Sequence, residues 1–169
     1  MGRSAVVGAL LGPIFGILRA IPAIALVPLF ILYFGIGELS KVLVIFTTAF
    51  YYMVLNSAAG AAAASELLLK AGMGVGLRGR HLFMKVVLPT SLPFILAGLR
   101  VAGAISWALL VASELIAAQE GLGYIVMDAG TFFHVRALYV GIAMIGILGL
   151  SLELILVWLE RRVVHWRGK

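Results

Sequence analysis

The stretch ALYVGIAMIGILGLSLELILVW, residues 137–158, decides the fold class of this chain. Glu153 is its only charged residue, and a helix needs about 20 apolar residues to cross the hydrocarbon core of a bilayer. Inside lipid no water can pair with free backbone groups, so a crossing is either a helix or part of a closed β-barrel. The run does not alternate apolar and polar residues as a strand of a membrane β-barrel would. The stretch therefore predicts a membrane-spanning helix, which we place at about 137–159.

The composition of the whole chain agrees with a membrane protein. Of its 169 residues 63% are hydrophobic and 12% are charged, and the mean hydropathy is +1.16. Soluble domains carry about 25% charged residues, and a soluble globule of this length could not hide so much apolar surface. The same apolar content excludes intrinsic disorder. The absence of cysteine excludes disulfides and thiolate metal sites.

Three further apolar runs predict membrane crossings at about 21–37, 41–60 and 95–117. We therefore expect an all-α integral membrane protein with about four transmembrane helices, organised as one membrane domain over residues 1–169. Between the last two crossings, residues 119–133 predict a loop with a short surface helix. Prolines are expected at helix starts, kinks or loops, and the runs and their borders contain Pro22, Pro28, Pro89 and Pro93.

The distribution of basic residues predicts the orientation. Four crossings place both termini on the same side as the 61–90 segment. Ten Lys and Arg residues fall on that side and only Lys41 and Arg136 on the other, so both termini and the segment are expected in the cytoplasm. The ten residues are Arg3, Arg19, Lys70, Arg78, Arg80, Lys85, Arg161, Arg162, Arg167 and Lys169.

The 61–90 segment is the most informative part of the chain. Helix-forming residues and leucines are followed by a glycine-rich stretch and then by a second apolar stripe at helical spacing. This pattern predicts a cytoplasmic helix–turn–helix element, because glycine adopts the positive φ that a bend requires. It fits either a docking element for a soluble partner or an interfacial helix held by anionic headgroups.

Within this segment, Lys70-Ala71-Gly72 is followed after three residues by Gly76 and after nine more by Val86-Val87-Leu88-Pro89. The spacing resembles the signature E-A-A-x3-G-x9-I-x-L-P in the transmembrane subunits of binding-protein-dependent ABC importers. Ala71, Gly76, Leu88 and Pro89 match that signature and Val86 replaces Ile, whereas Lys70 and Gly72 depart from it.

Other stretches are similar to the nitrate, sulfonate, taurine and bicarbonate branch of this family. They are Leu18-Arg19-Ala20-Ile21-Pro22, Val27-Pro28-Leu29-Phe30-Ile31-Leu32, Phe34-Gly35-Ile36-Gly37-Glu38, Ala97-Gly98-Leu99-Arg100, Ser113-Glu114-Leu115-Ile116 and Gly121-Leu122-Gly123-Tyr124.

The resemblance implies a type I permease in a bacterial-type inner membrane. Its function would be to form the translocation pathway for a small solute, an anion or a sulfonate. Segment 61–90 would couple to a cytoplasmic ATPase dimer, with Gly76 marking its turn. The residues assigned to that coupling are Lys70, Ala71, Gly72, Gly76, Arg80, Val86, Leu88 and Pro89. Lys70 reverses the charge of the family's Glu, so it is expected to tune the choice of ATPase.

The resemblance also implies the partners of the chain: the ATPase dimer, a second permease copy, an extracytoplasmic solute-binding protein and the bilayer, with no nucleic acid. ATP and Mg²⁺ would bind to the ATPase, and this chain is expected to hold no cofactor or metal and to act as a transport subunit rather than an enzyme. Family members generally have further spans before the region that begins here. A truncated, non-transporting membrane scaffold therefore stays open as the alternative.

Ionisable and polar residues within the runs are candidates for function, since a charge in a membrane span costs free energy and is expected to face protein or water. Arg100 and Glu153 lie at similar depths, so they are expected to pair; separate snorkelling to the interface is the alternative. Glu114 either lines the outer vestibule or reaches outer water. The candidate pathway residues are Ser106, Trp107, Ser113 and Glu114.

One further motif resembles a site but lacks the context for it. Residues 74–79 read G-x-G-x-x-G, yet an Ala- and Leu-rich helical pattern precedes them where a dinucleotide site needs a strand. The chain contains no G-x-x-x-x-G-K-[ST] motif, so ATP hydrolysis is assigned to a partner chain.

Overall fold

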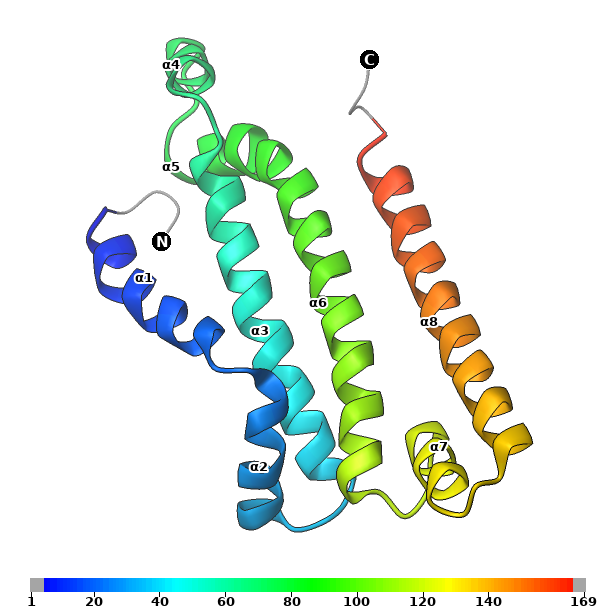
Figure 1. The fold of residues 1–169 in the computed structure, drawn as a ribbon. Helices are drawn as coiled ribbons and strands as arrows, with labels where there is room; N and C mark the ends of the chain where they lie inside the picture. The colour runs from blue at the N-terminus through cyan, green and yellow to red at the C-terminus, as the bar shows by residue number, and fades with distance from the viewer. Residues whose placement is uncertain (1–4, 166–169) are drawn as a thin grey trace. The chain divides into compact units, whose positions relative to one another are not determined.

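The computed structural model describes residues 5–165, and helices account for nearly all of them (Figure 1). The prediction of an all-α membrane protein is confirmed. η1 is a 3-10 helix and η2 is a π-helix. The elements in chain order are α1 (Ala5–Ala20), η1 (Ala23–Leu26), α2 (Val27–Phe34), α3 (Glu38–Ala62), α4 (Glu66–Gly74), α5 (Gly79–Leu82), η2 (Phe83–Val87), α6 (Leu88–Ala117), α7 (Leu122–Thr131) and α8 (Val135–Val163).

Three helical stretches in the described part of the chain are long and apolar enough to cross a membrane. They are α3, the continuous helix Gly79–Ile116 that contains most of α6, and α8. They correspond to the crossings predicted at 41–60, 95–117 and 137–159. A fourth crossing is counted only if α1 and the η1–α2 stretch form one interrupted span.

The crossing predicted at 21–37 differs from the structure, because η1 and α2 end at Phe34 and are too short to span a bilayer by themselves. Pro22 precedes η1 with φ −59° and ψ 122°, and Pro28 lies in the first turn of α2. Gly35 ends α2 with φ +79°, and its N–H donates to the carbonyl of Ile31 at 2.8 Å. Proline and glycine thus divide an apolar run that hydropathy alone treats as continuous.

The described residues form two compact units. One comprises residues 21–50 and 102–157 and the other residues 5–20, 51–101 and 158–165. In the first of these, Val27 of α2, Val44 of α3 and Leu109 of α6 form a buried core. Partly buried apolar residues packed against this core are Ala23, Phe30, Ile31 and Ile45.

In the other unit, the end of α3 and the beginning of α6 approach each other closely. A Cβ added to Gly60 would lie 2.8 Å from the Cβ of Phe94 and 3.0 Å from the carbonyl oxygen of Ser91. A Cβ added to Gly98 would lie 2.5 Å from the Cβ of Asn56. Small residues therefore set the distance between the two helices, as is typical of helix pairs in membranes.

The beginning of α6 accommodates two prolines. Pro89 lies in its first turn and Pro93 within it, and neither can donate a backbone hydrogen bond. The hydroxyl of Thr90 donates to the carbonyl of Val86 at 2.7 Å, and the buried hydroxyl of Ser91 donates to the carbonyl of Val87. The crossing predicted at 95–117 lies within α6, and the helix continues through both prolines.

Candidate functional site

The short helix α4 begins with a side-chain cap. Ser65 precedes it in an extended conformation, and its hydroxyl oxygen accepts a hydrogen bond from the N–H of Leu68 at 3.3 Å. The negative charge of Glu66 in the first turn interacts favourably with the helix dipole. It also lies 3.2 Å from the ammonium group of Lys70, one turn later. Both side chains are mostly exposed, so the pair adds little stability, but it compensates the charge of Lys70 within α4.

One face of α4 packs against the helix that follows the bend. Leu69 and Gly72 are buried. A Cβ on Gly72 would lie 2.8 Å from the Cδ1 of Leu82 and 3.2 Å from the Cγ2 of Val86. An alanine at position 72, as in the signature, would therefore require the Leu82 side chain to shift.

The bend after α4 is a Schellman motif centred on Gly76. Gly76 has φ +85°, and its N–H donates to the carbonyl of Met73 at 3.0 Å. The N–H of Leu77 donates to the carbonyl of Gly72, also at 3.0 Å. These are the two bonds of this motif, in which glycine occupies the left-handed position. The helix–turn–helix geometry predicted for the segment is present, although Gly72 and Gly74 belong to α4 and not to the bend.

After the bend, α5, η2 and α6 run on as one helix, with Arg78 in an extended conformation before α5. The structure divides the residues predicted for coupling by their surroundings. Lys70, Ala71, Gly76 and Arg80 are exposed, whereas Gly72 is buried and Val86, Leu88 and Pro89 are half-buried. The first group is available to a partner and the second holds the element together.

Sequence reasoning did not select the apolar side chains that this element exposes. Leu67 is 78% exposed, Val75 is 79% exposed, and Met73 is also exposed. The three-residue spacing of Leu69 and Gly72, which marks the buried face of α4, could have identified Leu67 as lying off that face. We call Leu67, Met73, Val75 and the Glu66–Lys70 ion pair the α4 surface.

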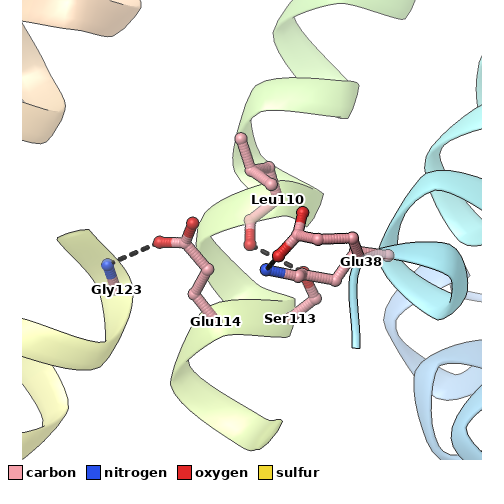
Figure 2. A network of polar contacts seen from close by, with 6 residues as sticks. Glu38, Leu110, Ser113, Glu114 and Gly123 are labelled. Atoms are coloured by element: carbon pink, nitrogen blue, oxygen red, sulfur yellow. Dashed lines mark hydrogen bonds and ion pairs between the residues drawn. The ribbon is translucent and has the colours of Figure 1, made fainter. Parts of the chain in front are cut away.

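Glu114, predicted as a pathway residue, lies beside the N-terminus of α7. Its Oε2 accepts a hydrogen bond of 2.7 Å from the N–H of Gly123, as Figure 2 shows. The carboxylate thus satisfies an N–H that the helix itself leaves unpaired. The neighbouring Ser113 is buried and donates to the carbonyl of Leu110 at 2.7 Å (Figure 2). The pathway roles of Ser113 and Glu114 stay predictions.

Figure 2 also shows Glu38, which forms an ion pair with Lys41 in the first turn of α3. Glu38 is exposed and Lys41 is largely covered. The two residues border a cavity of about 240 Å³ whose other lining residues are Ile36, Gly37, Ala118, Gln119 and Glu120.

Trp107 and Glu153 border a second cavity, of about 150 Å³, between α6 and α8. The indole lies against α8 where Gly149 leaves room, because a Cβ there would lie 2.8 Å from the indole nitrogen. Ala104, Leu152 and Leu156 complete the lining. The structure therefore places predicted residue Trp107 at a cavity together with Glu153, while Ser106 is half-buried.

Arg100 forms an ion pair of 3.1 Å between its Nη1 and the Oε2 of Glu160 near the end of α8. Glu153 precedes Glu160 by two helical turns, so the two carboxylates occupy the same face of α8. The pairing of Arg100 with Glu153 stays a prediction.

The comparison with known families bears on the whole chain. The model of the family "binding-protein-dependent transport system inner membrane component" matches residues 1–165. The chain belongs to this family. The resemblance to ABC importer permeases is thereby confirmed.

Individual relatives support the same branch of the family. The taurine transport system permease protein TauC of Escherichia coli (strain K12) is 39% identical over all 169 residues of the chain. The putative aliphatic sulfonates transport permease protein SsuC of Bacillus subtilis (strain 168) is 34% identical over 94% of the chain and 57% of its own length. The nitrate import permease protein NrtB of Synechococcus elongatus is 29% identical over 96% of the chain and 60% of its own length. The chain spans 62% of the length of the taurine permease, less than two thirds.

Proposed function

We propose that this chain is the membrane-spanning subunit of an ATP-driven importer of small sulfonates or related anions. Its α4 surface engages a cytoplasmic ATPase dimer, which binds ATP and Mg²⁺, and an extracytoplasmic binding protein delivers the solute. A second permease copy completes the pathway. The relatives named for taurine, aliphatic sulfonates and nitrate support the substrate class.

One observation carries the coupling proposal: the glycine at the signature position, Gly76, is the left-handed residue of a Schellman turn that ends α4. The turn holds Leu69 and Gly72 against the following helix and leaves Leu67 and Val75 exposed. Exposed apolar side chains on a short, capped helix beside an ion pair form a surface with apolar anchors and a polar rim, as protein interfaces have.

The coupling proposal is tested by co-purification of the co-expressed ATPase with Leu67→Asp. Leu67 makes few contacts within the chain, so the variant is expected to fold and to retain about tenfold less ATPase, the loss typical of an apolar anchor at an interface. Phe132→Asp is the matched control, because Phe132 is also an exposed apolar residue but follows α7. Equal retention by both variants would contradict the proposal.

The orientation is tested by cysteine labelling, which the absence of native cysteine makes simple. Leu67→Cys and Phe132→Cys each introduce one exposed thiol. In intact spheroplasts a membrane-impermeant maleimide is expected to label Phe132→Cys, and Leu67→Cys only after the membrane is permeabilised. Labelling of Leu67→Cys from outside would overturn the cytoplasmic location of the α4 surface and of both termini.

The substrate class is tested by ATPase activity in proteoliposomes that contain the assembled complex. Taurine, ethanesulfonate and nitrate are added in turn with the binding protein. Stimulation by at least one of these anions is expected. ATPase activity unaffected by any of them, or no ATPase bound at all, would favour a non-transporting scaffold.

A further inference from the structure

The last turns of α8 combine an aromatic ring with two arginines. The guanidinium of Arg162 lies over the ring of Trp158, 5.3 Å from its centroid. Trp158 is 56% exposed, and Arg161 and Arg162 are exposed as well. The stacking orders Arg162 on the surface, because a cation over an indole face is attracted to the ring.

The acidic residue beside these arginines does not neutralise them. Glu160 lies 3.1 Å from Arg100, and its side chain is only 21% exposed. Its negative charge therefore balances Arg100. Arg161 and Arg162 leave two net positive charges at the end of α8, where the helix dipole also favours cations.

The exposed surface of α8 changes character along the helix. Leu154 and Ile155 are exposed apolar side chains one turn before Trp158, and the arginines follow one turn after it. α8 is long and apolar enough to cross a membrane. In such a helix an aromatic ring followed by arginines marks the level of the lipid headgroups.

We propose that Trp158, Arg161 and Arg162 form a binding site for an anionic phospholipid. The arginines pair with the phosphate and the indole lies at the glycerol level. Leu154 and Ile155 contact the acyl chains. Inorganic phosphate or an acidic protein surface would use the arginines but would leave Leu154 and Ile155 without a partner.

Native mass spectrometry of the detergent-solubilised permease tests this site. Phosphatidylglycerol and phosphatidylcholine with the same acyl chains are added in competition. The unaltered chain is expected to retain phosphatidylglycerol preferentially. Each of Arg161→Gln and Arg162→Gln is expected to lower that preference about fivefold, the effect expected for one basic residue at an anionic surface.

Arg136→Gln is the matched control, since Arg136 is an exposed arginine at the opposite end of the same helix. Arg162→Lys keeps the charge and should retain more phosphatidylglycerol than Arg162→Gln. Equal retention of the two lipids, or a preference unchanged in the double variant Arg161→Gln/Arg162→Gln, would overturn the proposal.

Two other outcomes would also overturn it. Displacement of the lipid by millimolar inorganic phosphate would identify a general anion site. A double variant that keeps its lipid preference but loses the co-expressed ATPase would identify a protein contact. Because lipid retention is measured on the permease without its ATPase, failure here is distinguishable from failure of the proposed transport function.

Discussion

The bend that follows α4 and the first turn of α7 both contain glycines, but the glycines meet different surroundings. Gly76 has φ +85°, and nothing lies within 4 Å of a Cβ added to it. A Cβ added to Gly123 would lie 2.6 Å from the Cβ of Glu114 and 2.7 Å from the carbonyl oxygen of Val111. The first glycine supplies a backbone conformation on an open surface, and the second supplies space in a packed junction.

This contrast separates two kinds of role. The turn after α4 fixes the direction of the chain and leaves the α4 surface accessible. The junction before α7 lets a carboxylate of α6 reach the N-terminus of α7, which fixes one helix against another. An accessible turn suits contact with a partner, and a packed junction suits rigidity. Three substitutions test the contrast.

The largest effect is expected for Gly123→Ala. The added methyl would displace Glu114 and break its hydrogen bond to the N–H at position 123, at a cost of about 3 kcal/mol. The apparent melting temperature in detergent should fall by several degrees. Gly130→Ala is the control, because Gly130 lies in the same helix and a Cβ added to it would have nothing within 4 Å. If both variants had the same apparent melting temperature, the close approach at Gly123 would not contribute to stability.

A smaller effect is expected for Gly76→Ala, since an L-residue in the left-handed region costs about 1 kcal/mol. The loss should appear as faster hydrogen exchange at the N–H of Leu77, which closes the Schellman turn. In Gly76→Asn the N–H of Leu77 should exchange more slowly than in Gly76→Ala, because asparagine tolerates the left-handed conformation better than alanine. Identical exchange in all three proteins would show that positive φ is not what position 76 requires.

The smallest effect is expected for Gly74→Ala. Gly74 is the last residue of α4 and has open space around its Cβ position, so alanine should stabilise the helix by about 0.5 kcal/mol. Thermal unfolding in detergent measures the change. Gly72→Ala, one half-turn earlier, should gain less stability than Gly74→Ala, because the Leu82 side chain must shift to make room for the methyl group. A destabilised Gly74→Ala would mean that α4 needs glycine flexibility at its end.

The long crossings could be predicted because a continuous apolar run and the thickness of a bilayer together set helix length. The predictions at 41–60 and 137–159 fall within α3 and α8. The prediction at 21–37 did not anticipate that Pro22 and Gly35 would confine the helical residues to η1 and α2. A mean hydropathy over the run does not register single prolines and glycines, although these residues change the backbone conformation and end the helix.

The candidate site could be predicted in part. The spacing located Gly76, and the structure places a left-handed turn there. The fit of Gly72 against Leu82 and the capping of α7 by Glu114 depend on how segments fold back on each other. No periodicity in the sequence encodes such contacts, so the exposed residues of the α4 surface and the partner of Glu114 became visible only in three dimensions.

The hydroxyl groups at the beginning of α6 have a consequence for how that helix can deform. Thr90 and Ser91 donate to the carbonyls of Val86 and Val87 within and beside the π-helical turn, where Pro89 and Pro93 have no N–H to give. These hydroxyls can follow the carbonyls through small changes in helical winding, because their donors rotate with the side chain and not with the peptide plane. The stretch between α5 and α6 can thus change its winding while the carbonyls of Val86 and Val87 keep a hydrogen-bond donor.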